Sequence, residues 1–248
     1  MDINKQPGSD RAQHEIEHGK FLASGETEAI WGWGSAAGAR RAEKRGAAII
    51  KAAGLRPGVR ALELGCGTGL FTRMFAETGA ELIANDISTE LIERARETNP
   101  AVTFICAQFE DLPSTKPYHA IIGSSVLHHL DLGRALLKSY ALLKPGGVMA
   151  FAEPNMLNPQ VFAERTFLRR MLSYVSPDES AFVRWSLAAT LKSNGFGEIK
   201  INPFDWLHPA VPASLVNSVE HIGSFLERMP IVREFAGSLL IFCRKPVK

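Results

Sequence analysis

Three glycines alternate with other residues in "LELGCGTGLF" (62–71), directly after an apolar run. Gly65, Gly67 and Gly69 would let the backbone approach a nucleotide closely. An acid, Asp86, ends the next apolar run about 20 residues downstream, where a carboxylate can accept hydrogen bonds from both hydroxyls of a ribose. The residue types and their spacing therefore predict a nucleotide-cofactor site.

The same loop distinguishes between cofactors. A dinucleotide-binding loop has the pattern G-x-G-x-x-G, whose third glycine allows close packing of helix on strand. Leu70 occupies that third position in this chain. Glu63, two residues before the first glycine, would repel a pyrophosphate but suits a sulfonium or ammonium group. S-adenosylmethionine carries both cations, so we expect this cofactor, with S-adenosylhomocysteine as product, and not NAD.

The elements that position this loop follow a strand–helix rhythm. Continuous apolar runs, typical of buried parallel strands, lie at 59–65, 81–87, 102–107, 119–126, 148–154, 198–204 and 238–245. Helical patterns with start and stop signals lie at 39–53, 69–78, 88–98, 131–143, 159–173, 178–194 and 212–228. We therefore expect an α/β fold with a doubly wound, mostly parallel seven-stranded sheet and a helical cap.

The pattern changes near both ends of the chain. Residues 1–38 are polar and are predicted to form an N-terminal arm, while residues 39–248 form the main domain, with 155–197 as its helical cap region. The stretch "WGWGSAAG" (31–38) places two tryptophans among glycines. We expect it to serve as a lid over the site, and the alternative is that it only fastens the arm to the core.

Several motifs together resemble those of the class I S-adenosylmethionine-dependent methyltransferases, in their small-molecule branch. "LELGCGTG" is similar to the first motif of that family and "ANDIS" to the second. Three later stretches resemble the motifs that the family has at its next three strands. They are "AQFEDLP" (107–113), "AIIGSSVLHHL" (120–130) and "LLKPGGVMAFAEP" (142–154). The resemblance implies a Rossmann-like fold and methyl transfer to O, N or C of a small molecule, with an apolar acceptor as one option.

The resemblance also implies the residues that bind the cofactor. Asp86 would hold the ribose and Ile87 would pack on the adenine. Gln108 stands where the family often has an aspartate that reads the adenine amino group, and its side-chain carbonyl can accept the same hydrogen bond. The complete predicted set is Glu63, Gly65, Cys66, Gly67, Gly69, Asp86, Ile87, Gln108, Phe109, Ser124 and Ser125.

Residues after the fourth and fifth strands should face the transferred methyl group, because the carboxyl ends of parallel strands share one edge. His128 and His129 lie there, and a histidine that titrates near neutral pH can take a proton from a hydroxyl or an amine. We expect His129, or otherwise His128, as the catalytic base, against the alternative of a structural pair. A metal site completed by Asp131 is not expected, since adjacent ligands rarely share one metal.

Contacts with the acceptor are expected from Trp33, Glu153, Asn155 and Trp206. Glu153 ends a buried strand and Asn155 follows it among prolines, although Asn155 would serve equally to cap a turn. Trp185 and His208 are further candidates beside Trp206, with plain core packing as the alternative. The apolar residues that suit either an apolar pocket or helix packing are Phe162, Phe167, Leu168, Phe182, Leu215, Val219, Ile222 and Phe225.

Composition limits the classes of function. The 248 residues carry a formal net charge of +2, from 28 basic and 26 acidic side chains, which gives no bulk attraction for nucleic acid. The basic stretch "ARRAEKR" (39–45) is expected on a solvated helix face. Three cysteines without a CxxC pair indicate neither a disulfide framework nor a zinc site. With a polar N-terminus and no membrane-spanning run, we expect a cytoplasmic monomer or homodimer that acts on a small molecule.

Two other functions share the same cofactor loop. A methyltransferase of RNA or protein is one, although "GSSV" (123–126) differs from the N/D-P-P-Y motif that related enzymes use on nucleobase amines. A protein that binds S-adenosylmethionine without methylating anything is the other.

Overall fold

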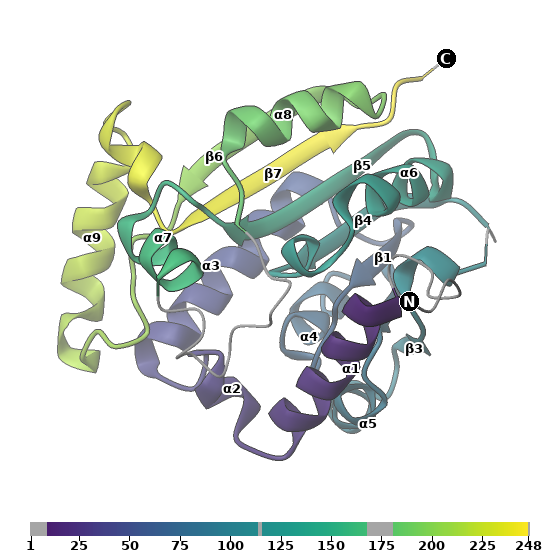
Figure 1. Ribbon diagram of the computed structural model, residues 1–248, viewed down its shortest axis with the longest axis horizontal. Helices are drawn as coiled ribbons and strands as arrows, with labels where there is room; N and C mark the ends of the chain where they lie inside the picture. The colour runs from purple at the N-terminus through teal and green to yellow at the C-terminus, as the bar shows by residue number, and fades with distance from the viewer. Residues whose placement is uncertain (1–8, 114–115, 168–180, 248) are drawn as a thin grey trace, which may run out of the picture.

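One twisted sheet organises the molecule. The computed structural model describes residues 9–113, 116–167 and 181–247 (Figure 1). Within them, seven strands lie in the order β3-β2-β1-β4-β5-β7-β6, and β7 runs antiparallel to both of its neighbours while the other pairs are parallel. The strands are β1 (Arg60–Leu64), β2 (Glu81–Asp86), β3 (Thr103–Cys106), β4 (Tyr118–Ser124), β5 (Leu143–Pro154), β6 (Gly197–Phe204) and β7 (Ser238–Arg244). The predicted doubly wound, mostly parallel seven-stranded sheet is confirmed.

The helices begin at side chains that cap them. Ser35, Ser88 and Asp131 each accept a hydrogen bond from a backbone N–H in the first turn of α3, α5 and α6, which satisfies a donor that has no partner within the helix. The α-helices are α1 (Ser9–Ala23), α2 (Thr27–Ile30), α3 (Ala36–Ala53), α4 (Leu70–Ala76), α5 (Thr89–Thr98), α6 (Leu132–Leu142), α7 (Pro159–Thr166), α8 (Arg184–Ser193) and α9 (Val216–Leu226). Short 3₁₀ helices are η1 (Phe109–Asp111), η2 (Leu127–His129), η4 (Ala213–Leu215) and η5 (Val232–Phe235).

Two elements begin five or more residues away from the position that the sequence predicts. The helix expected at 178–194 begins at Arg184, because Phe182 forms a parallel bridge with Asn155. The strand expected at 148–154 begins already at Leu143, which pairs with Tyr118 of β4. Residues 168–173 and 178–180 of the two expected helices lie outside the described residues.

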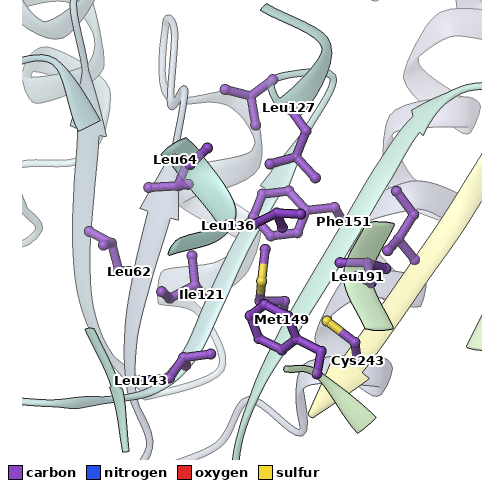
Figure 2. Close-up of a cluster of buried hydrophobic side chains, with 14 of the residues drawn as sticks. Leu62, Leu64, Ile121, Leu127, Leu136, Leu143, Met149, Phe151, Leu191 and Cys243 are labelled. Atoms are coloured by element: carbon purple, nitrogen blue, oxygen red, sulfur yellow. The ribbon is translucent and has the colours of Figure 1, made fainter. Parts of the chain in front are cut away.

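Helices cover both faces of the sheet. Buried side chains of α3 and α4, such as Ile49 and Phe75, pack on one face. On the other face, Leu136 of α6 and Leu191 of α8 pack on strand residues including Met149 (Figure 2). Of the region expected to form a cap, α8 therefore belongs to the layer that covers the sheet. In Figure 1, α7 lies toward the end of the molecule where α9 is found.

The strand order places a crevice between β1 and β4. The chain leaves β1 toward β2 and β3, and then returns to add β4 on the opposite side of β1. At such a reversal the connections after neighbouring strands lead away to opposite faces, which leaves an opening at their carboxyl ends. The glycine loop after β1 and the "SSVLHH" segment after β4 both reach this opening.

A matched pair of substitutions on α6 tests the core. Leu136 is fully buried, whereas its neighbour Leu137 is 63% exposed. Leu136→Ala is expected to lower the free energy of unfolding by about 2–5 kcal/mol, because it leaves a cavity under the helix. Leu137→Ala should change it by no more than about 0.5 kcal/mol. Urea titration of both variants measures this, and equal losses would contradict the packing described.

Candidate active site

A large cavity opens at the carboxyl ends of the central strands. Its volume is about 570 Å³, which is in the range of small-molecule pockets. The loops after β1, β2, β4 and β5 line it, together with α1, α7 and two segments around 31–33 and 205–209. Within the described residues, the predicted site residues that line it are Gly65, Cys66, Gly67, Asp86, Ile87, Gln108, Phe109, Ser124, Ser125, His128, His129, Trp33 and Trp206.

Two glycines of the loop stand where a side chain would collide with its neighbours. Gly65 and Gly67 have positive φ values of 62° and 53°. A Cβ on Gly65 would lie 2.4 Å from Val126, and one on Gly67 would lie 2.9 Å from the ring of Trp31. Both positions therefore require glycine, and both glycines line the cavity, where the lack of a side chain lets a ligand approach the backbone.

Gly69 has a different role from the one expected. It does not border the cavity, and a Cβ there would lie 2.5 Å from the side-chain nitrogen of Asn99. Asn99 donates a hydrogen bond to the Gly69 carbonyl at 3.2 Å. The third glycine thus lets the start of α4 pack against α5, and it does not touch the cofactor space.

Asp86 is fixed by backbone groups. One carboxylate oxygen accepts a hydrogen bond from the Gly67 N–H at 2.8 Å, and the other accepts one from the Ser88 N–H at 2.9 Å. Burial raises the pKa of the Asp86 carboxyl, while these backbone donors act in the opposite direction. Each oxygen retains a second lone pair, so the carboxylate can still accept from two vicinal hydroxyls.

Glu63 differs from its expected state. It is 2% exposed, and it does not border the cavity. Burial raises the pKa of its carboxyl to about 8, so the carboxyl is mainly protonated at pH 7. A fixed negative charge beneath the loop is therefore not present in the protein without ligand. The sequence could not reveal this, because the shift comes from the surrounding core.

A buried guanidinium, Arg45 of α3, closes the cavity beside the end of β4. It donates to the Ser125 hydroxyl at 2.9 Å, to the Ser124 hydroxyl at 3.3 Å and to the Ser238 hydroxyl at 2.7 Å. Its Nε lies 3.9 Å from the carboxylate of Asp205. Ser125 holds a positive φ of 56° at this point, so the network constrains a strained backbone.

Arg45 remains charged although it is buried. Burial and the neighbouring Arg41 lower its pKa to about 10, against the attraction of Asp205 and Glu153. Arg41 also lines the cavity, with Nε 2.9 Å from Asp205. The sequence interpretation placed both arginines on a solvated face. The signal that could have found them is their spacing of four, which puts both on one side of α3.

The two histidines have separate surroundings. His128 is buried, and its Nδ1 lies 2.6 Å from Glu153. The other oxygen of Glu153 accepts from the backbone N–H groups of Val126 and Leu127 at 2.9 and 2.8 Å. His129 instead has its Nδ1 3.0 Å from Glu15 of α1. Glu153 was expected to contact the acceptor, but it does not border the cavity and holds His128 and its loop.

This pairing fixes the state of His128. Burial and the charge of His129 lower the pKa of His128 to about 4, while Glu153 opposes that change. Burial alone would raise the pKa of Glu153, but its three donors outweigh this, and the pKa lies below its usual value. At neutral pH an ionised Glu153 can only accept, so Nδ1 of His128 carries the proton and Nε2 the lone pair.

The remaining acceptor candidates separate into two groups. Trp33, Trp206 and His208 line the cavity. Asn155 does not; it is buried and donates to the carbonyls of Glu234 and Ala236 at 2.8 and 2.7 Å, so it joins β5 to η5. Trp185 is 56% exposed and also lies away from the cavity.

Of the apolar residues considered for an acceptor pocket, none that the structure describes lines the cavity. Phe182 belongs to the core, Val219 is partly buried, and Leu168 lies outside the described residues. Five are exposed on the surface, namely Phe162, Phe167, Leu215, Ile222 and Phe225. Among the described residues, no group of three or more His, Cys, Asp or Glu side chains is arranged to hold a metal ion.

The shifted pKa of Glu63 makes a prediction about stability. The folded-state pKa of Glu63, about 8, exceeds the ordinary value of 4.5. The contribution of Glu63 to the free energy of unfolding is therefore complete below pH 4.5 and is lost as the pH rises to 8, because the unfolded chain releases this proton more readily. Glu63→Gln has no proton to release at this position. Between pH 5 and pH 9 its free energy of unfolding should therefore fall by up to about 4 kcal/mol less than that of wild type. Urea unfolding at both pH values measures this.

The control for that comparison is Glu97→Gln, a substitution on the exposed surface of α5. Its pH profile should run parallel to that of wild type. A parallel profile for Glu63→Gln as well would mean that Glu63 is ionised in the folded protein.

The comparisons with known proteins agree with this geometry. Residues 61–147 match the model of a family described as "Methyltransferase domain". The chain is 34% identical over 114 residues to ubiquinone biosynthesis O-methyltransferase of Xanthomonas campestris pv. campestris (strain B100), a match that covers 43% of this chain and 47% of that protein. It is 36% identical over 97 residues to malonyl-[acyl-carrier protein] O-methyltransferase of Pectobacterium atrosepticum, covering 38% of each. The chain thus spans about half of the length of the curated relatives it matches, between 38% and 57%.

Solved structures resemble the chain over most of its length. N-methyltransferase NodS of Bradyrhizobium japonicum WM9, solved with S-adenosylhomocysteine, has a TM-score of 0.64 at 14% identity, covering 94% of this chain and 99% of that one. A putative methyltransferase of Haloferax volcanii, solved with its activator Trm112, has a TM-score of 0.63 at 17% identity, covering 98% and 100%. These likenesses concern the fold. Residues 61–147, which hold the glycine loop and the strands that follow it, thus resemble a methyltransferase domain, and the fold of the chain resembles that of solved methyltransferases.

Proposed function

We propose that this chain transfers a methyl group from S-adenosylmethionine to an O, N or C atom of a small molecule. The observation that carries the proposal is that one cavity joins the bare glycine backbone and Asp86 to the neutral imidazole of His128. A cofactor held by the glycine backbone and Asp86 would have its reactive end between β1 and β4, on the side of His128.

The chain offers partners for each part of the cofactor. Asp86 would hold the ribose hydroxyls, and the backbone at Gly65 and Gly67 would lie against the methionine and ribose. Ile87 and Phe109 supply apolar contact for the adenine, with Gln108 beside them. When bound, S-adenosylmethionine supplies a methyl group on a sulfonium, which is already activated for in-line displacement.

Arg45 is the natural partner for the carboxylate of the methionine part. It is a charged guanidinium that lines the cavity, and its nearest carboxylate, Asp205, also pairs with Arg41. A buried and a partly buried cation that share one carboxylate favour an additional anion, because a buried charge is costly unless it is paired. The serine hydroxyls of Ser124 and Ser125 would border the same group.

His128 is the group best prepared to accept a proton from the acceptor. It is uncharged at neutral pH, and Glu153 holds its ring with the lone pair on Nε2. A base with a carboxylate behind it is oriented and becomes a stronger acceptor as positive charge develops on the ring. We therefore propose His128 as the base in preference to His129, whose pairing with Glu15 connects it to α1.

Two further features are consistent with a small-molecule acceptor. Trp31, Trp33 and residues of α1 line the cavity, which supports the proposal that the N-terminal arm serves as a lid. The curated relatives are named for O-methylation in ubiquinone biosynthesis and on malonyl-[acyl-carrier protein], which makes an oxygen acceptor the first to screen.

Asp86→Asn tests the ribose contact. Loss of charge-assisted hydrogen bonds should weaken the binding of both S-adenosylhomocysteine and methylthioadenosine by about 1–3 kcal/mol. Calorimetric titration measures both affinities, with the exposed Glu77→Gln as the control that should bind like wild type. Unchanged affinity in Asp86→Asn would remove the cofactor assignment of this residue.

Arg45→Gln tests the carboxylate contact separately. Methylthioadenosine has the ribose and the adenine but lacks the amino-acid part. Arg45→Gln should therefore weaken S-adenosylhomocysteine by about 1.5–3 kcal/mol and leave methylthioadenosine unchanged. Calorimetric titration with both ligands measures this. Equal losses of affinity for the two ligands would instead indicate a general collapse of the site.

A further inference from the structure

Large apolar side chains gather on the surface at one end of the molecule. On α9 and just after it, Ile222, Phe225 and Met229 recur at spacings of three and four, which puts them on one side of the helix. They are 59%, 62% and 39% exposed, and Ile231, close behind them, is 78% exposed. An exposed apolar stripe of this kind marks an interaction site more often than chance, since monomeric surfaces rarely keep such patches.

The stripe continues onto α7. Phe235 of η5 is exposed, and its carbonyl accepts a hydrogen bond from Asn158, the residue that caps α7, at 2.8 Å. Phe162 and Phe167 then lie exposed on α7 and at its end, with ring centroids 5.9 Å apart. Figure 1 shows α7 and α9 at the same end of the molecule. We call this surface the α9 face, and it consists of Phe162, Phe167, Leu215, Ile222, Phe225, Met229, Ile231 and Phe235.

The acidic side chains of this segment are neutralised. Between 213 and 237 the acids are Glu220, Glu227 and Glu234. They pair with Arg40, Lys44 and Arg184 at 3.0, 2.7 and 2.7 Å, and Glu234 also has Arg233 at 3.5 Å. Arg228, exposed between Phe225 and Met229, has no ion pair within the part of the chain that the structure describes. The 213–237 part of the face therefore combines apolar side chains with a cation and with acids that are all paired.

We infer that the α9 face docks on the surface of a lipid bilayer that carries anionic headgroups. Aromatic and aliphatic side chains enter the boundary between headgroups and acyl chains, and a nearby arginine is attracted to anionic lipid. None of the described helices is long and apolar enough to cross a bilayer, so the association is peripheral.

The face also adjoins the cavity. Gly223 of α9 lets Trp206 approach so closely that a Cβ on the glycine would lie 2.9 Å from the Trp206 Cβ, and Trp206 lines the cavity. On α7, Gln160 and Val161 line the cavity while Phe162 is exposed. A bilayer could thus present an apolar acceptor at the cavity mouth, an extension that rests on the proposed function, whereas the docking itself does not.

Co-sedimentation of the full chain with vesicles tests the inference. Vesicles of phosphatidylcholine with a quarter phosphatidylglycerol should bind wild type, and pure phosphatidylcholine should bind it more weakly, because the attraction to Arg228 is lost. The double variant Phe225→Ser/Ile231→Ser should reduce the partition coefficient about tenfold or more. Leu137→Ser, equally exposed on α6 away from this face, should bind like wild type.

The outcomes are separable. Absence of sedimentation with either vesicle, or equal sedimentation of wild type and the double variant, overturns the inference. So does light scattering that finds a wild-type dimer and a monomeric double variant, since the occupant of the face is then a second copy. Titration with S-adenosylhomocysteine should be unchanged in the double variant, which verifies its fold. If wild type binds vesicles but does not bind S-adenosylhomocysteine, the docking inference is supported and the proposed function is contradicted.

Discussion

The buried guanidinium of Arg45 is the interaction on which the architecture of the site depends. It comes from the helix before β1, and it binds hydroxyls at the end of β4 and at the start of β7. A charge in the core is tolerated only where hydrogen bonds and a counter-charge surround it, so these elements must converge at one point. Asp205, held at a positive φ of 74° after β6, provides the counter-charge.

A second buried carboxylate organises the neighbouring loop. Glu153 at the end of β5 accepts from two backbone N–H groups and from His128 of the segment after β4. The two parallel strands end side by side, which makes the contact possible. The same carboxylate therefore shapes the loop and sets the proton position on the imidazole, while burial and the neighbouring His129 keep the ring uncharged at neutral pH. Structure and chemistry are inseparable at this point.

The surface of the molecule divides into regions with different physical character. The cavity is lined by charged groups and tryptophans, which suits polar ligands with an aromatic part. The α9 face is apolar with paired acids, and it lies behind the cavity wall formed by Trp206 and α7. The described apolar residues that resembled a pocket in the sequence thus lie outside the cavity. A pattern of apolar residues cannot tell the inside of a cavity from the outside of its wall.

The sequence by itself determined the features that depend on neighbours along the chain. Buried runs, capping residues and glycines predicted the seven strands, most helices and the cofactor loop, because each signal acts over a few residues. The place of Asp86 after the second strand followed from the same periodicity. Tertiary structure alone decided what burial and distant partners impose. Burial keeps Glu63 protonated, Gly69 serves helix packing and not ligand contact, and Glu153 contacts His128. Tertiary structure also brought Arg45 from an apparently solvated stretch into the site. These outcomes depend on the dielectric surroundings and on contacts between residues far apart in the chain, which no local pattern encodes.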